Sequence, residues 1–139
     1  MTEPKIGLSV NFSFEAAHRL VKGYPGKCRN LHGHSFQVTC HIEGYALDQC
    51  GMLRDFSDFD LLKAWCKENW DHATLLADSD HTTIEFLKST RQRFFLFEDN
   101  PTSEVIARYL LLKSEELGIP LSGVTLNETC THSCTVSRV

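Results

Sequence analysis

The sequence predicts an α+β fold in which an antiparallel sheet carries two helices on one face. Apolar and polar residues alternate in two early segments and again near the C-terminus, which is typical of strands with one buried face. Between these segments, apolar residues recur at helical spacing in two stretches. The resulting order is ββααββ. A chain of 139 residues with 42% hydrophobic residues suits a single domain spanning residues 1–139.

The first two strands are predicted at 6–14 and at about 34–43, where every second side chain is apolar. If the alternation of the first strand continues beyond residue 14, His18 falls on its apolar face. In the second strand, His34 and, one step earlier, His32 fall on the apolar face in the same way. The three histidines would therefore lie together at one end of the buried face, provided that the first strand does not break before His18. Glycines and a proline in the intervening stretch predict a loop.

Two amphipathic helices are predicted in the middle of the chain. The first begins at about Ser57, which is a plausible N-cap, and its apolar stripe ends near Asn69. The second begins with Asn100 as N-cap and Pro101 in the first turn, and it ends at Gly118.

The pattern is weaker between the two helices, in residues 73–99. A short helix at 83–89 and a short buried strand at 93–97 are the best interpretations of this part. Near the C-terminus, alternation over 124–128 and again from Cys134 predicts two strands joined by a tight connection, which is a hairpin.

Composition excludes several classes of protein. The net charge of -4 gives no basic field that would attract nucleic acid or an anionic membrane. No apolar run approaches the roughly 20 residues of a membrane span, and none follows the first five residues as in a signal peptide. We therefore expect a cytoplasmic protein whose six cysteines are free thiols.

Three histidines are candidate ligands of one metal ion: His18, His32 and His34. Three imidazoles around zinc leave a fourth position open for water or substrate, which is the pattern of a catalytic site. Two alternatives stay open. His18 could be an ordinary residue at a strand end, and the metal could serve only to hold the fold together.

Cys28, Asp71 and His72 are candidates for acid–base catalysis. Cys28 lies four residues before His32, so its thiol can lie beside whatever the metal binds, and a nearby metal lowers the pKa of a thiol. Asp71 precedes His72 and could fix its tautomer and hold its charge. The alternative for this pair is a histidine stabilised by the dipole at a helix C-terminus.

Three further residues are candidates for substrate binding. Glu128 ends an apolar strand, where a carboxylate can accept two parallel N–H bonds from the edge of a guanine-like ring. Thr102 and Glu104 lie at a predicted helix N-terminus, where backbone donors face a ligand. The alternatives are a surface glutamate on an edge strand and ordinary residues of a first helical turn.

The order of these motifs resembles the 6-pyruvoyl-tetrahydropterin synthase superfamily over nearly the whole chain. The segments that carry the resemblance are Phe14–Leu20 (FEAAHRL), Cys28–Phe36 (CRNLHGHSF), Asp55-Phe56, Trp70-Asp71-His72, Asn100–Glu104 (NPTSE) and Glu128–Thr131 (ETCT). The three residues between Cys28 and His32 are similar to the spacing in the bacterial 6-carboxy-5,6,7,8-tetrahydropterin synthase branch, which belongs to the queuosine pathway.

The resemblance implies a tunnelling fold (T-fold), in which ββααββ subunits join their sheets into a barrel as a trimer or as a hexamer built from two trimers. It implies Zn²⁺ on His18, His32 and His34. It also implies proton transfer by Cys28 with Asp71 and His72, which neighbouring chains can contribute, and a pterin ring anchored by Glu128.

The implied reaction converts 7,8-dihydroneopterin triphosphate to 6-carboxy-5,6,7,8-tetrahydropterin, acetaldehyde and triphosphate. Lys22, Lys27 and Arg29 are the cations nearest the predicted site that could bind the triphosphate. Two rival functions remain at this point. One is a synthase of 6-pyruvoyl-tetrahydropterin or a related pterin side-chain lyase, and the other is a pterin- or purine-binding module without catalysis.

Overall fold

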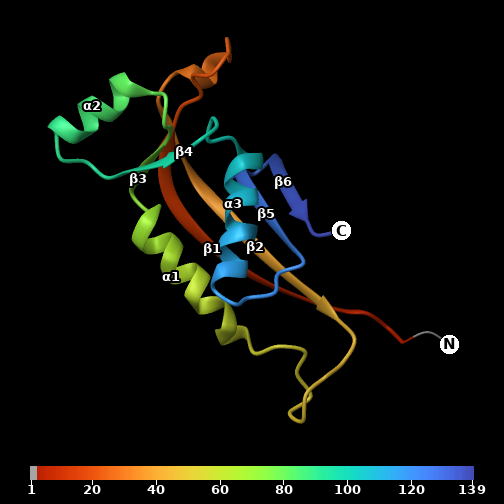
Figure 1. The fold of residues 1–139 in the computed structure, drawn as a ribbon. Helices are drawn as coiled ribbons and strands as arrows, with labels where there is room; N and C mark the ends of the chain where they lie inside the picture. Colours follow the sequence, from red (N-terminus) through yellow and green to blue (C-terminus); the bar gives the residue numbers. More distant parts are fainter. Residues whose placement is uncertain (1–2) are drawn as a thin grey trace.

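A computed structural model describes residues 3–139 and shows one curved sheet of six strands (Figure 1). The strands are β1 (Ile6–His18), β2 (His32–Gly44), β3 (Ala73–Ala77), β4 (Phe94–Phe97), β5 (Gly123–Thr129) and β6 (His132–Ser137). The helices are α1 (Asp60–Asn69), α2 (His81–Ser89) and α3 (Ser103–Glu116), with single 3-10 turns η1 (Lys27–Arg29) and η2 (Phe56–Phe59). Within residues 3–139, no helix is both long and apolar enough to cross a membrane.

The sheet order is β4-β3-β1-β2-β5-β6. The four strands β1, β2, β5 and β6 pair antiparallel, as the alternating pattern predicts. Strands β3 and β4 extend the sheet on the other side of β1 in parallel orientation, so the sheet is mixed. The crossover through α2 between β3 and β4 makes that orientation possible, because parallel neighbours need a long connection. The predicted α+β class is confirmed, with β3, α2 and β4 inserted between the two predicted helices.

The long β1–β2 hairpin is the frame of the molecule. Its pairing runs without a break from Ile6 opposite Gly44 to His18 opposite His32. The first strand therefore continues beyond the predicted end at residue 14 and reaches His18. The apolar parity continues as well, since Ala16 and His18 are both buried.

The main core lies between the sheet and helices α1 and α3, which cover the same face (Figure 1). Phe14 and Phe36 stack from adjacent strands with ring centroids 5.0 Å apart, and Trp70 tilts against Phe14 at 5.4 Å. Full burial of one such side chain contributes about 1.5–3 kcal/mol. These rings therefore hold the sheet against the helices immediately beside the end of the hairpin that carries the histidines.

Helix α2 packs on the other face of the added strands. Leu76 of β3 belongs to a small separate cluster with residues of α2, whereas its neighbour Leu75 belongs to the main core. Successive residues of a strand point to opposite faces, so β3 is buried on both sides. A strand buried on both faces shows no polar alternation, which explains the weak pattern of this region.

Both predicted N-caps are wrong. Asp55 caps the turn η2 by accepting a hydrogen bond from the Ser57 amide at 2.9 Å, and α1 begins only at Asp60. Helix α3 begins at Ser103, and its cap is Thr102, whose hydroxyl oxygen accepts from the Val105 amide at 3.2 Å. Two good capping residues stand close together at the start of α3, and local sequence does not distinguish them.

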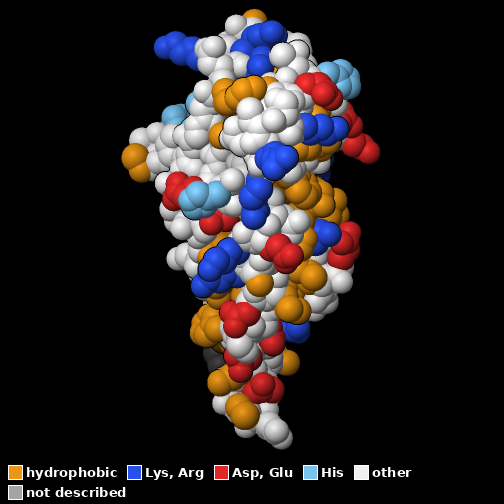
Figure 2. Space-filling view, turned by 90° about the vertical axis from the view of Figure 1, so that its left-hand side faces the viewer, with side chains coloured by type: hydrophobic (Ala, Val, Ile, Leu, Met, Phe, Trp, Pro, Cys, Tyr) orange, Lys and Arg blue, Asp and Glu red, His pale blue; other side chains and the backbone are white. Residues whose placement is uncertain are grey.

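The narrow end of the molecule exposes several large hydrophobic side chains. Figure 2 shows orange and red side chains together on the narrow end, where Figure 1 places the connection between β2 and α1. Leu47, Met52 and Phe56 of this connection are each about half exposed. The pale-blue histidine side chains that Figure 2 shows lie toward the opposite, broader end.

A three-histidine cluster and its candidate acid–base residues

The register of the β1–β2 hairpin brings three histidines together. His18 is the direct cross-strand partner of His32, and His34 pairs with Ala16, one step along the same face. Side chains directly opposite or diagonal on one face of an antiparallel pair are within reach of one another. The cluster is therefore a consequence of strand parity and register, and the predicted convergence of the three imidazoles is confirmed.

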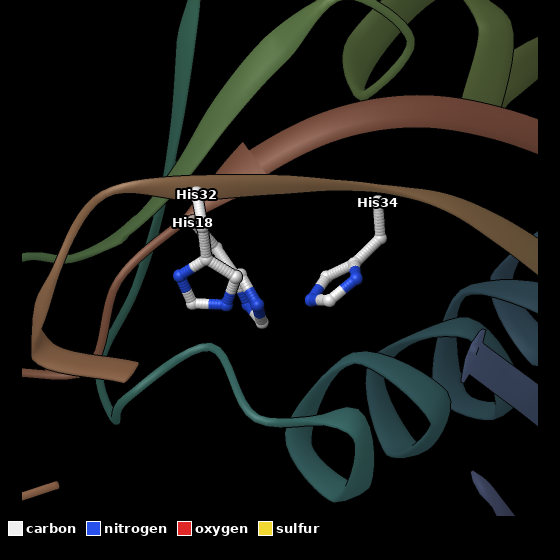
Figure 3. A group of neighbouring side chains, drawn as sticks. All are labelled: His18, His32 and His34. Carbon is white, nitrogen blue, oxygen red and sulfur yellow. The ribbon is translucent and has the colours of Figure 1, made fainter. Parts of the chain in front are cut away.

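The three rings face a common point (Figure 3). One ring nitrogen from each of His18, His32 and His34 lies within 4.8 Å of the other two. The ring centroids are 4.6 Å apart for His18 and His32, 5.0 Å for His32 and His34, and 5.1 Å for His18 and His34. Three imidazole nitrogens at this spacing can all bind one divalent ion.

Backbone carbonyls orient two of the rings. The Nδ1 atom of His18 lies 2.8 Å from the carbonyl oxygen of Pro101, and that of His32 lies 2.6 Å from the carbonyl oxygen of Asn30. A carbonyl oxygen only accepts, so each Nδ1 carries the proton and each Nε2 presents its lone pair. Metal-binding histidines are commonly held in this way through their other nitrogen.

Electrostatics also favours the neutral imidazoles that a metal needs. Burial lowers the pKa of His18 and of His34, and the nearby Glu128 carboxylate opposes this only in part. The Nε2 atoms of His18 and His34 are buried and have no hydrogen-bond partner within residues 3–139. Buried polar atoms are rarely left unpaired. Two unpaired nitrogens aimed at one point fit a bound metal ion.

Glu128 lies beside the cluster at the end of β5. Its Oε1 atom is 3.9 Å from Nε2 of His18, and its side chain is 27% exposed. It also lines a cavity of about 710 Å³ that lies over β2 and the β5–β6 turn, together with His34, Asn127 and Cys130. A carboxylate at the edge of this cavity can meet a ligand that also approaches the histidines.

Cys28 lies in the turn η1, inside the loop between His18 and His32, and is half-buried. Its carbonyl oxygen accepts from the Leu20 amide at 2.9 Å, which ties the turn to the end of β1. The Cys28 sulfur lies near the Tyr24 hydroxyl and raises the pKa of that tyrosine. Among the described residues, the group of side chains that could hold a metal ion consists of the three histidines and does not include Cys28.

Asp71 and His72 form a hydrogen-bonded pair at the start of β3. Asp71 Oδ2 is 3.0 Å from Nδ1 of His72, and Asp71 Oδ1 accepts from the Glu15 amide at 2.8 Å. The bond from Glu15 is the main cause of the lowered pKa of Asp71, so the carboxylate stays charged. His72 has a positive φ of 60°, and its side chain is 76% exposed. This pair is held in place while the imidazole remains accessible.

His72 lines a cavity of about 630 Å³ together with Glu15, Ser35 and His34. Glu15 and Ser35 have the opposite strand parity to His18 and His34. In residues 3–139, the hydrogen bonds of the His72 ring and amide run to Asp71 and Glu15, and none reaches Cys28. Hydrogen bonds therefore link Asp71 and His72 as a pair that does not include Cys28.

Thr102 and Glu104 lie at the N-terminus of α3, as predicted, although the helix starts later. The Thr102 hydroxyl is occupied as the cap, and the Glu104 carboxylate lies close enough to Cys134 to contribute, after burial, to the raised pKa of that thiol. The same segment supplies the Pro101 carbonyl that binds His18. The start of α3 thus lies beside the histidine cluster.

The model of the family described as 6-pyruvoyl tetrahydropterin synthase matches residues 7–139.

The chain belongs to this family.

Curated relatives in the 6-pyruvoyl tetrahydropterin synthase family carry a more specific name. A protein of Synechocystis sp. is 39% identical over 131 residues, which are 88% of this chain and 85% of the relative. One of Haemophilus influenzae is 33% identical over 137 residues, 91% of this chain and 95% of the relative. A third, from Rickettsia bellii, is 37% identical over 99 residues, 70% and 71% of the two chains. All three are named 6-carboxy-5,6,7,8-tetrahydropterin synthase.

Two solved structures have the same fold. The 6-pyruvoyl tetrahydropterin synthase of Caenorhabditis elegans superposes with a TM-score of 0.73 at 27% identity, covering 100% of this chain and 99% of that one. An uncharacterized protein of Wolinella succinogenes gives a TM-score of 0.82 at 23% identity over 99% of this chain and 100% of that one. The resemblance seen in the motifs is therefore confirmed for the family and its fold.

Several residues that shape the family's histidine site in this chain have no sequence signal. The carbonyls of Pro101 and Asn30 act through backbone atoms, which any residue type provides. The backbone amide and carbonyl of Glu15, which bond Asp71 and His72, likewise cannot be predicted from residue type. The position of Tyr24 near Cys28 is different, because an aromatic residue in a short glycine-rich loop indicates that a packing partner lies close by.

Proposed function

We propose that this chain is a zinc-dependent lyase that converts 7,8-dihydroneopterin triphosphate to 6-carboxy-5,6,7,8-tetrahydropterin, acetaldehyde and triphosphate, in the cytoplasmic synthesis of queuosine. The observation that carries the proposal is the cluster of His18, His32 and His34 on paired strands. It occurs in a chain whose curated relatives, at 33–39% identity over most of its length, bear the name of this activity.

The three Nε2 atoms would hold the ion, because two Nδ1 atoms are already committed to backbone carbonyls. Bound zinc supplies a Lewis acid that polarises oxygen atoms of the substrate side chain. Three protein ligands and an accessible face suit a catalytic site rather than a closed structural one. His32 and His34 are only partly buried, which leaves that face open to a ligand.

In this proposal, Cys28 and His72 move protons between the pterin ring and its side chain, and Asp71 holds His72 in the required tautomer. The Asp71–His72 hydrogen bond and the charged state of Asp71 support the last role. Cys28 lies in the turn η1 and His72 directly before β3, and a complete site would combine them from different copies of the chain. The high exposure of His72 supports such an arrangement.

Two free strand edges support a homo-oligomeric barrel, as a trimer or as two stacked trimers. Strand β6 forms one edge of the sheet, and β1 pairs with β3 only at residues 16–18, which leaves 6–15 open on that side. β1 and β6 run in opposite directions, so β6 of one copy can pair antiparallel with β1 of the next. Pairing would also cover edges that otherwise favour uncontrolled association.

Glu128 would anchor the pterin ring through paired N–H bonds to its carboxylate. Its position 3.9 Å from His18 would place the ring beside the metal. Thr102 and Glu104 would contact the substrate from the start of α3. Lys27 and Arg29, both in the turn that holds Cys28, are the cations that we assign to the triphosphate, together with Lys22.

Product analysis tests the proposal. Zinc-loaded protein is incubated with 7,8-dihydroneopterin triphosphate, and the products are identified by mass spectrometry. We expect 6-carboxy-5,6,7,8-tetrahydropterin and acetaldehyde. Formation of 6-pyruvoyl-tetrahydropterin without acetaldehyde would support the activity in the family's own name instead. Binding of the pterin with no turnover would mean that the chain is a binding module.

A further inference from the structure

A charged pair joins the end of β1 to helix α2. Arg19 directly follows His18, and its Nη1 atom donates to the Thr83 hydroxyl at 3.2 Å. Its Nε atom lies 3.6 Å from Oδ2 of Asp80. Arg19 Nε and Asp80 Oδ2 are both buried, and neither has a hydrogen-bond partner among the described residues. The guanidinium of Arg19 is thus the only positive group that the structure of residues 3–139 places against Asp80 Oδ2.

The two carboxylate oxygens of Asp80 have different roles. Oδ1 caps α2 by accepting from the Thr83 hydroxyl at 2.9 Å and from the Thr83 amide at 3.4 Å. Oδ2 faces Arg19. Asp80 is only 6% exposed, and a buried carboxylate needs a compensating charge. The cap needs an oxygen atom, whereas the contact with Arg19 needs the negative charge.

The pair leads directly to the loop that carries Cys28. The residue after Arg19 is Leu20, whose amide donates to the Cys28 carbonyl oxygen at 2.9 Å. The next two amides, of Val21 and Lys22, donate to the Asn100 side chain at 2.9 and 3.0 Å. The segment 19–22 is therefore bound by α2 and its cap through Arg19 and by Asn100 through its backbone amides. The same segment binds the backbone of Cys28 through Leu20.

We propose that Arg19 and Asp80 are positioning residues, which use α2 as a brace to fix the loop that carries Cys28. The inference rests on the proposed function, in which Cys28 is the reacting thiol. It assigns a role to helix α2, which connects β3 to β4, whereas β3 itself pairs with β1 as far as His18. A small displacement of a reacting group is enough to lower the rate of a reaction substantially.

The buried charge of Asp80 should contribute more to holding this loop than the exposed charge of Asp78. Lys22 Nζ lies 3.9 Å from Oδ1 of Asp78, but the two side chains are 42% and 53% exposed. Such an exposed pair contributes little, because water screens it. Asp78→Asn therefore makes the same change of charge two residues away from Asp80 and serves as the matched control.

Asp80→Asn tests the inference, because asparagine still caps a helix but lacks the charge that faces Arg19. The alkylation rate of each cysteine by iodoacetamide is followed by peptide mass spectrometry in the zinc-loaded protein. We expect a several-fold faster reaction at Cys28 and an unchanged rate at Cys50, which is exposed in the wild type. We also expect kcat to fall on the order of tenfold with a smaller change in KM.

Thr83→Val provides a second test that does not depend on the fold tolerating Asp80→Asn. It removes the hydroxyl that lies between Arg19 and Asp80 at nearly constant volume, and Cys28 should again react faster. Wild-type rates at Cys28 in both variants, or parallel acceleration at Cys50, would overturn the inference. The alkylation rates need no pterin, so they decide this inference even if the wild-type protein shows no turnover.

Discussion

The Nδ1 atom of His18 lies 2.8 Å from the carbonyl oxygen of Pro101, which joins the end of β1 to the start of α3. This bond crosses a large distance in sequence and fixes which nitrogen of His18 faces His32 and His34. The precise shape of the histidine cluster therefore depends on the helix layer as well as on the hairpin that carries all three rings.

Removal of one imidazole should remove the metal. We expect His18→Ala to lower zinc affinity on the order of 100-fold or more, because the loss of a direct ligand exceeds the effect of losing its supporting bond. Metal content after dialysis, measured by plasma mass spectrometry, checks this. His41→Ala is the control, since His41 points to the other face of the sheet and bonds Thr125 at 2.9 Å. Equal zinc in both variants would contradict the assignment.

Cys28→Ala should abolish turnover and leave zinc bound. A positioned acid–base group typically contributes 10²–10⁴-fold to a rate, roughly the loss expected here. Substrate turnover and metal content are measured on the same sample. Cys50→Ala, which changes an exposed thiol elsewhere, should keep full activity. Loss of zinc from Cys28→Ala would instead identify Cys28 as a ligand.

Glu128→Gln should weaken pterin binding. The neutral amide offers one acceptor and one donor, so it cannot accept two parallel N–H bonds. Because hydrogen bonds to charged groups are the stronger ones, we expect Kd to rise on the order of tenfold or more. Quenching of pterin fluorescence measures Kd. Glu85→Gln, on the exposed face of α2, is the matched control, and an equal Kd in the two variants would argue against the anchor.

Alkaline pH should destabilise the protein through a buried thiol. Burial raises the pKa of Cys40 from 9.0 to about 12. At a pH between these two pKa values, the Cys40 thiol is deprotonated in the unfolded chain but keeps its proton in the folded chain. The free energy of unfolding therefore falls as the pH rises. The loss is up to about 1.4 kcal/mol per pH unit.

Denaturant titrations from pH 8 to about pH 10.5 measure this slope. Cys40→Val keeps the volume and removes the proton, so its slope should be smaller than that of the wild type. The same burial should protect Cys40 from alkylation at neutral pH, whereas the exposed Cys130 reacts. An identical pH slope in the variant would show that other groups cause the effect.

Much of the fold could be predicted because strand parity is a local property. The alternation up to Phe14 and around Phe36 already implied a hairpin with His18, His32 and His34 on one face. The segment β3–α2–β4 was less predictable. β3 is buried on both faces, so it lacks the alternation from which a single-faced strand is recognised.

The candidate site could be predicted in its residue types but less well in its geometry. Cys28 lies in a loop turn, and His72 lies directly before β3 with a positive φ, so strand parity predicts the side-chain direction of neither. The role of Asn100 shows the same limit. Its side chain has the chemistry of a helix cap, yet it binds the backbone of residues 21 and 22, which are distant in sequence.

The three histidines all belong to one hairpin, within the stretch from residue 18 to residue 34. Closing so short a loop costs little entropy, so the donors can meet as soon as the two strands zip together. Metal binding is coupled to folding, so an ion held by these three rings would stabilise this hairpin directly.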